Sequence, residues 1–383
     1  LELEDRNWAC ITTSMTAHPD VLILGGGIIG LTTAYFLAES GARVTIADKG
    51  DFGQQASWAG AGIISPANPE YAHTAYKQLH ARSSAMYPAL SQRLREQTGI
   101  DNGYFVCGGL ELFLSDEDES SDEWRGEGIA CEELTGAELH RRQPDLAPNI
   151  ERAYYLPDMA QVRNPRHLKA LKVACSARGV QFHPDCPVRR LVRNGSRIEA
   201  VETDRGRLTA GRYLMATGAW TDALLEPLGW RPGIHPVRGQ IALLNTGTPG
   251  VRPLLLHGKR YLVPRGDGRV LIGSTEEDAG FDARPTASVI ADLLELAVSL
   301  VPDLAHASVE RCWAGLRPGS PEGKPYLGIV PGTDNLFLAA GHFRSGIQLS
   351  PATGLVMKEV LVGEKPTIPL EDFRLDRSAA PLA

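Results

Sequence analysis

The 383-residue sequence has no apolar run of the roughly 18 residues that a membrane-spanning helix needs, so we expect no membrane association. It also lacks an excess of basic residues, because 39 Lys and Arg stand against 46 Asp and Glu, a net charge of −7. This acidic balance is not typical of a nucleic-acid-binding surface. What remains is a globular chain, 43% hydrophobic, which is long enough to bury a large core.

Cysteine is sparse, and its spacing indicates neither a metal site nor a disulfide framework. The six cysteines are Cys10, Cys107, Cys131, Cys175, Cys186 and Cys312. No two are spaced as CxxC, and no Cys/His cluster has zinc-finger spacing, so no metal is expected. Disulfide frameworks are typical of short secreted chains, so we expect free thiols and a reducing compartment, the cytoplasm.

The first 19 residues contain Glu2, Glu4 and Asp5 but no apolar segment of the kind that a secretory signal carries. Met15 comes shortly before the first strand-like stretch and is a candidate native start. We expect residues 1–19 to be a disordered leader, and we leave them out of the fold prediction.

Glycine, by contrast, is abundant, with 40 residues. The stretch "VLILGGGIIGLTTAYFLAESGARVTIADKG" predicts a strand at 21–24, a helix at 29–39 and a second strand at 43–47, followed by Asp48. Gly25, Gly27 and Gly30 satisfy GxGxxG between the first strand and the helix. In a dinucleotide site these glycines allow a sharp turn, close approach of a pyrophosphate, and helix–strand packing, while an acid near position 48 binds ribose. We therefore predict a dinucleotide cradle.

Strand–helix–strand patterns recur near residues 20–50, 165–220 and 335–362, and alternating patterns typical of antiparallel strands lie between them. This arrangement predicts an α/β nucleotide domain assembled from separated segments, with a second sheet domain threaded through it.

Three further stretches separate FAD from NAD as the ligand: "GQQASWAGAGIISP" (53–66), "LMATGAW" (214–220) and "AAGHFRSGIQLSPATG" (339–354). A fourth specific stretch is "WAGLRPGSPEGKPYLG" (313–328). With these and "GGGIIG", the chain from about 21 to 363 resembles the D-amino acid oxidase superfamily of FAD-dependent amine oxidases, and within it the bacterial glycine oxidases. The resemblance implies an α/β fold (α+β overall), a Rossmann-like FAD-binding domain with an inserted antiparallel-sheet substrate domain. We expect the former at 20–86, 155–225 and 312–370, and the latter at 87–154 and 226–311.

The resemblance also implies which residues hold FAD, without a covalent bond. Residues 28–30 would contact the phosphates, Asp48 and Lys49 the ribose region, and Val188 the adenine, although a plain strand valine is the alternative there. The turn and helix at 342–348 would lie under the flavin pyrimidine edge, where a helix N-terminus stabilises the negative charge of the reduced ring. The expected cofactor residues are Gly25, Gly27, Ile28, Ile29, Gly30, Asp48, Lys49, Ala56, Ser57, Ala61, Gly62, Ile63, Val188, Gly218, Gly341, His342, Phe343, Arg344, Ser345, Gly346, Ile347 and Gln348.

A carboxylate substrate requires a cationic partner, and Arg317 and Arg344 are the candidates because each lies among Gly or Pro in an otherwise apolar segment. A guanidinium can bind a carboxylate through two parallel hydrogen bonds. Tyr261 matches a pocket tyrosine of the resembled family. Structural arginines and a core tyrosine are the alternatives.

Two positions depart from the glycine oxidase pattern, since Glu276 replaces a pocket methionine and Lys259 a histidine. We expect Glu276 either to bind the substrate amine or to point to solvent. His342 is expected to be a cofactor neighbour rather than a general base, because the family's chemistry needs none. Cys312 lies near the position where sarcosine oxidases carry a flavin-linked cysteine, but a buried free thiol is expected.

The resemblance implies oxidation of glycine, another small amine or a D-amino acid, with hydride passing from Cα to flavin N5 and O2 reduced to H2O2. The imine of glycine would serve thiamine thiazole synthesis. A D-amino acid dehydrogenase that reduces a quinone and a sarcosine oxidase are the alternatives, and a non-catalytic flavin-binding subunit is a third. The expected partners are a small amino acid, O2 and further copies of the chain, in a homo-oligomer such as a tetramer.

Overall fold

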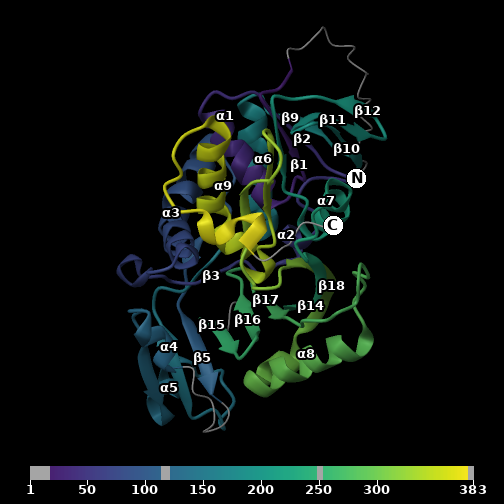
Figure 1. Cartoon of the computed structure of the whole chain (residues 1–383). Coiled ribbons are helices and arrows are strands. Elements are labelled where there is room, and N and C mark those ends of the chain that lie inside the picture. Colours follow the sequence, from purple (N-terminus) through teal and green to yellow (C-terminus); the bar gives the residue numbers. More distant parts are fainter. Residues whose placement is uncertain (1–17, 114–120, 248–252, 378–383) are drawn as a thin grey trace.

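The structure is a computed structural model, and it describes residues 18–113, 121–247 and 253–377. The predicted leader therefore lies outside the described residues, apart from positions 18 and 19. Two large sheets organise the chain: a six-stranded sheet in the upper half of Figure 1, and an eight-stranded sheet in the lower half.

The six-stranded sheet has the order β19-β20-β13-β1-β2-β9 and is parallel except for the β19–β20 pair. Its strands are β1 (Val21–Leu24), β2 (Val44–Ala47), β9 (Gln181–His183), β13 (Arg212–Met215), β19 (Tyr326–Ile329) and β20 (Leu336–Ala340). Both faces of the sheet are covered, so its central strands are apolar: β1, β2 and β20 are buried throughout. The predicted strand at 21–24 and helix at 29–39 are confirmed.

Helices cover one face of this sheet. They are α1 (Ile28–Glu39), α3 (Ala75–Thr98), α6 (Asn164–Ala177) and α9 (Gly346–Val362). In Figure 1 the yellow α9 lies beside α1, although the two helices are about 300 residues apart in the sequence, and they contact one another directly. On β1, Val21 and Ile23 pack in the core with these helices. The C-terminal segment therefore completes a domain that the N-terminal segment begins.

The opposite face of the six-stranded sheet packs on a small antiparallel sheet and on α7 (Thr221–Leu225). The small sheet consists of β10 (Val188–Asn194), β11 (Arg197–Thr203) and β12 (Gly206–Leu208). Leu22 and Leu24 face this second core, as the two-residue period of a strand requires.

The eight-stranded sheet has the order β18-β14-β17-β16-β15-β5-β7-β6 and is antiparallel except for the β15–β5 pair. Its strands are β5 (Gly109–Phe113), β6 (Glu132–Thr135), β7 (Arg152–Leu156), β14 (His235–Asn245), β15 (Leu254–His257), β16 (Arg260–Pro264), β17 (Arg269–Gly273) and β18 (Ser308–Gly319). Helix α8 (Ala287–Leu300) buries its apolar stripe against this sheet.

Shorter elements fill the space between and beside the two sheets. They are α2 (Ala56–Ala59), β3 (Ile63–Ile64), β4 (Phe105–Val106), β8 (Ala160–Gln161), α4 (Ser121–Gly126) and α5 (Gly136–Arg142). The mixed α/β architecture agrees with the predicted fold class. The predicted domain boundaries after residues 86, 154 and 311 fall inside α3, β7 and β18, so these elements continue across them.

Candidate active site

The predicted glycine turn lies between β1 and α1. Gly25 has a φ of +105°, and a Cβ on it would lie 2.3 Å from the Ala216 carbonyl oxygen of the neighbouring strand. A Cβ on Gly30 would lie 2.0 Å from the Gly25 oxygen, so this glycine lets α1 pack against the turn. At Gly27 the nearest atom to a Cβ would be Ser57 Oγ at 3.2 Å. Two glycines therefore serve the packing, while Gly27 faces a cavity.

Asp48 follows β2 and ties the turn to this strand. One carboxylate oxygen accepts the Gly26 amide at 2.7 Å and the other accepts the Gly50 amide at 3.0 Å. Burial raises the pKa of Asp48, and these two hydrogen bonds act in the opposite direction. A carboxylate can accept about four hydrogen bonds, so Asp48 keeps acceptor capacity toward the cavity it lines.

A first cavity of about 400 Å³ starts at this turn and runs to the N-terminus of α9. Most of the predicted cofactor residues line it: Gly25, Gly27, Ile28, Ile29, Asp48, Lys49, Ala56, Ser57, Val188, Gly218, His342, Phe343, Arg344, Gly346 and Ile347. Trp220 also lines it and was not predicted, although it belongs to the "GAW" stretch that follows β13. The Lys49 ammonium lies 3.1 Å from the centre of its ring.

A second cavity of about 330 Å³ adjoins the first. The predicted residues that line it are Ala56, Ala61, Gly62, Ile63, Tyr261, Arg317, Arg344, Ser345, Ile347 and Gln348. Arg317, Arg344, Ile347, Ala56 and Gly60 line both cavities, so both predicted arginines lie where the two spaces meet. Gly30, Gly341 and Glu276 line neither.

The second glycine turn joins β20 to α9. Gly341 has a φ of +80° and serves the backbone rather than either cavity wall. His342 is 2% exposed, its Nε2 lies 3.2 Å from Thr353 Oγ1, and burial lowers its pKa to about 3. Its imidazole is therefore neutral. Gln348 accepts the Ser65 amide at 2.8 Å and donates to Ser84 at 2.7 Å, which fixes the wall of the second cavity.

Arg317 extends from β18 across the neighbouring strand β14. A Cβ on Gly239 would lie 2.2 Å from its guanidinium, so this glycine provides the space for the side chain. Nη1 donates to the Thr275 carbonyl at 2.8 Å and Nη2 to Ser274 Oγ at 2.6 Å. Burial lowers the pKa of Arg317. These two acceptors are neutral oxygens, and within the described residues Arg317 forms no ion pair.

Tyr261 lies close to Arg317 and acts to raise the pKa of this arginine. It is on β16, directly opposite Gly273 of β17, and a Cβ on Gly273 would lie 2.9 Å from the tyrosine ring. Gly239 and Gly273, which were not predicted, thus make room for the two predicted substrate residues. A glycine inside a strand often marks such a close approach, so "RGQIALL" and "VLIGST" carried this signal.

Arg344 is electrostatically different, because it already has an acidic partner. Its Nη1 lies 2.5 Å from Glu276, and its Nη2 donates to the Lys259 carbonyl at 2.8 Å. The Lys259 ammonium lies 2.8 Å from the other Glu276 oxygen. Burial acts to raise the pKa of Glu276, but the hydrogen bonds from these two cations outweigh it, and the pKa is lowered. Glu276 is thus held by two cations at the edge of the second cavity.

The far part of the second cavity contains further residues that were not predicted: His80, Glu111 and Trp124. Trp124 Nε1 donates to Glu111 at 2.5 Å. They come from α3, β5 and α4, which no short motif connects. Within the described ranges no group of His, Cys, Asp and Glu is arranged to hold a metal, and no helix is long and apolar enough to cross a membrane.

Comparison with known proteins gives consistent matches along most of the chain. The family profile described as FAD dependent oxidoreductase matches residues 20–360. A glycine oxidase from Pseudomonas aeruginosa is 40% identical over 349 residues, covering 91% of this chain and 96% of that protein. The crystal structure of glycine oxidase from Geobacillus kaustophilus superposes with a TM-score of 0.89 at 34% identity, covering 94% and 99% of the two chains. A bifunctional protein ThiO/ThiG from Trichormus variabilis is 34% identical over 94% of this chain and 55% of its own length.

Proposed function

The chain belongs to the family of FAD-dependent oxidoreductases and is an amino acid oxidase of the glycine oxidase type, and from this premise we propose that glycine is its substrate. One observation carries the proposal: a half-buried guanidinium, Arg317, without an acidic partner among the described residues, lies where the two cavities meet. A ligand carboxylate of a small amino acid would supply the missing negative charge.

The first cavity fits FAD. It begins at a glycine turn and a helix N-terminus, which suit a pyrophosphate, and ends at the second turn below α9. We propose that Gly27 and Ile28 face the phosphates, Asp48 and Lys49 the ribose region, Val188 the adenine, and residues 342–348 the flavin. When bound, FAD would accept the Cα hydrogen of the amino acid together with its two bonding electrons, that is, as a hydride.

The protein's own part of the reaction is binding and orientation. Arg317 would hold the substrate carboxylate through two parallel hydrogen bonds while Tyr261 supports it from β16 of the same sheet. This fixes Cα at the boundary of the two cavities, next to the first. The amino acid is oxidised to its imine, which water converts to the 2-oxo acid and ammonia, and O2 is reduced to H2O2. His342 stays neutral and buried, so it would act as a cofactor neighbour and not as a base.

The test is a panel of substrates. The second cavity is larger than glycine requires, so glycine, sarcosine, D-alanine and D-proline are compared by H2O2 release, with a quinone as a competing acceptor. We expect the highest kcat/KM with glycine and O2. A clear preference for sarcosine would indicate a sarcosine oxidase, and turnover only with the quinone would indicate a dehydrogenase. No turnover with any of them would leave a flavin-binding subunit.

The bond between FAD and the protein is proposed to be non-covalent, because Cys312 lines neither cavity. Acid or heat should therefore release intact FAD, and flavin that stays with the denatured chain would contradict this.

The described cysteines are free, which suits the proposed cytoplasmic compartment. We further propose a homo-oligomer, such as a tetramer, and a supply of glycine imine to thiamine thiazole synthesis. The likeness to bifunctional ThiO/ThiG proteins supports the latter.

A further inference from the structure

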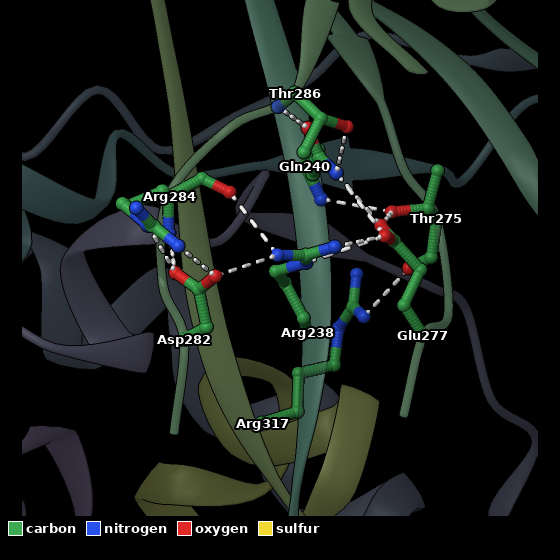
Figure 2. A network of polar contacts seen from close by, with 8 residues as sticks. All are labelled: Arg238, Gln240, Thr275, Glu277, Asp282, Arg284, Thr286 and Arg317. Atoms are coloured by element: carbon green, nitrogen blue, oxygen red, sulfur yellow. Dashed lines mark hydrogen bonds and ion pairs between the residues drawn. The ribbon is translucent and has the colours of Figure 1, made fainter. Parts of the chain in front are cut away.

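Behind Arg317, on the opposite face of the eight-stranded sheet, lies a partly buried polar network (Figure 2). Side chains of β14 alternate between the two faces. Gly239 and Ile241 line the second cavity, so Arg238 and Gln240 point away from it. Gln240 is fully buried and Arg238 is 9% exposed, so both need polar partners inside the protein.

The strand pairing beside these residues contains a β-bulge. Strands β14 and β17 pair up to Ile241 and Gly273, and pairing resumes between Arg238 and Glu277. Two residues, 239 and 240, therefore lie opposite three, 274–276. Such bulges redirect groups and occur often beside active sites. Here the bulge turns the Thr275 carbonyl and the Ser274 hydroxyl toward the Arg317 guanidinium.

Thr275 connects the two faces. Its carbonyl accepts Arg317 Nη1 at 2.8 Å on the cavity side. Its hydroxyl accepts the Gln240 amide at 3.1 Å and donates to Glu277 on the other side. Figure 2 shows that Thr275 contacts both Arg317 and this carboxylate. The orientation of the bulge therefore depends on what holds Glu277.

Glu277 is held by a charged and a neutral partner. Arg238 Nη2 lies 2.6 Å from one carboxylate oxygen, and Gln240 Nε2 lies 3.0 Å from the other. Burial acts to raise the pKa of Glu277, but the bonds from Thr275 and Arg238 outweigh it, and the pKa is lowered. Gln240 is itself fixed by two hydrogen bonds with Thr286, of 3.1 and 2.7 Å.

We propose that the Arg238–Glu277 ion pair is a positioning device for the substrate-binding guanidinium of Arg317. Two acceptors of this guanidinium, the Thr275 carbonyl and the Ser274 hydroxyl, belong to the bulge, and the ion pair holds the bulge from the opposite face of the sheet. A two-pronged contact with a carboxylate requires a fixed orientation of the fork, which supporting hydrogen bonds provide. The proposal rests on the proposed role of Arg317 in binding the substrate carboxylate.

The first experiment is Glu277→Gln in the FAD-loaded enzyme, because glutamine keeps the size and an acceptor for Thr275 but removes the charge. We expect KM for glycine and the Kd of acetate, followed by flavin absorbance, to rise together by roughly tenfold, with a smaller change in kcat and unchanged FAD content. The matched control is Glu310→Gln, which removes a carboxylate that lies 2.7 Å from Arg269 in the same sheet. It should leave KM and Kd unchanged, since its hydrogen bonds among the described residues go to Asn245 and Arg269 and not to the bulge.

A double-mutant cycle separates positioning from general damage. In an Arg317→Ala background, Glu277→Gln should cause no further loss of kcat/KM, because the group it positions is gone. The same fold-loss in both backgrounds, or wild-type KM and Kd in Glu277→Gln, would overturn the proposal. Near-normal kcat/KM of Arg317→Ala alone would instead overturn the proposed function, and the positioning role with it.

If Glu277→Gln does not fold, Thr275→Val takes its place. Valine keeps the backbone carbonyl that Arg317 contacts but removes the hydroxyl that joins the bulge to Glu277. We expect KM for glycine and the Kd of acetate to rise by about threefold. Unchanged values in this folded variant would contradict the positioning role.

Discussion

The two cavities share a wall but are built in different ways. The wall of the first comes largely from chain turns: the backbone after β1, after β2 and before α9, with Gly25 in a conformation that favours glycine. The wall of the second comes from side chains on strands of the eight-stranded sheet, such as Tyr261 on β16 and Arg317 on β18. A turn can serve any ligand with a phosphate, whereas placed side chains select a particular substrate.

The two arginines at the junction of the cavities also differ in the charge of their partners. Arg317 is bonded to neutral oxygens, whereas Arg344, which lines the same junction, is 2.5 Å from Glu276. His342 in the first cavity is neutral. A ligand carboxylate therefore gains most at Arg317, because at Arg344 it must compete with a carboxylate that is already in place.

The largest effect is expected from Gly27→Val, which breaks the first cavity alone. A valine would project from the turn toward Ser57 and the space proposed for the pyrophosphate. We expect a folded protein that binds no FAD, measured as the flavin absorbance of the purified chain. Gly266→Val, at an exposed position where a Cβ would meet nothing within 4 Å, should keep its FAD. Stoichiometric FAD in Gly27→Val would remove Gly27 from the cradle.

The next largest effect is expected from Arg317→Ala, which removes the proposed substrate anchor where the two cavities meet but leaves the glycine turn of the first cavity intact. Removing one partner of a buried charge pair costs about 2–5 kcal/mol. At about 1.4 kcal/mol per decade, kcat/KM for glycine should fall by roughly 30-fold to several thousand-fold. FAD content should stay normal. Arg317→Lys should recover only part of the activity, because an ammonium lacks the two-pronged geometry. Near-normal kcat/KM in the alanine variant would indicate that Arg344, and not Arg317, binds the substrate carboxylate.

The contrast between the cavities also explains how far the sequence could predict them. The glycine turn at 25–30 is local, so its spacing alone predicted β1, α1 and the roles of Gly25 and Gly30, which the structure bears out. Arg317 and Tyr261 required the family resemblance. Neither route indicated that Gly239 and Gly273 make room for them, because strand register depends on pairing between residues far apart in the chain.

The ion pairs between residues far apart in the sequence could not be predicted either. Glu276 was expected either to meet the substrate amine or to point to solvent, and in the structure it binds Arg344, 68 residues away, and Lys259. Such a pair depends on where β20 and the segment after β17 come together in space. No periodicity or motif in the sequence encodes that distance.

A smaller effect is expected from Arg344→Ala. Its ion pair with Glu276 is partly exposed, and such pairs contribute roughly 0–1 kcal/mol. A ligand carboxylate would gain little there, so kcat/KM for glycine should fall by less than about tenfold. Glu276→Gln, which frees Arg344 from its acidic partner, should tighten acetate binding by a fewfold at most, measured by flavin absorbance. A loss in Arg344→Ala as large as in Arg317→Ala would abolish the proposed difference between the two arginines.

The smallest effect on catalysis is expected at His342, because its lowered pKa, about 3, keeps it neutral at every working pH. His342→Gln should leave the pH profile of kcat/KM unchanged, and a shifted limb of this profile would make the residue an acid or a base of the reaction.

The pH dependence of stability should change instead. The unfolded imidazole has a pKa of about 6.5, so below that pH the unfolded state binds a proton that the folded state does not. His342 therefore costs stability as the pH falls from about 6.5 toward 3, by up to about 1.4 kcal/mol per pH unit. His342→Gln should flatten the fall of Tm over this range.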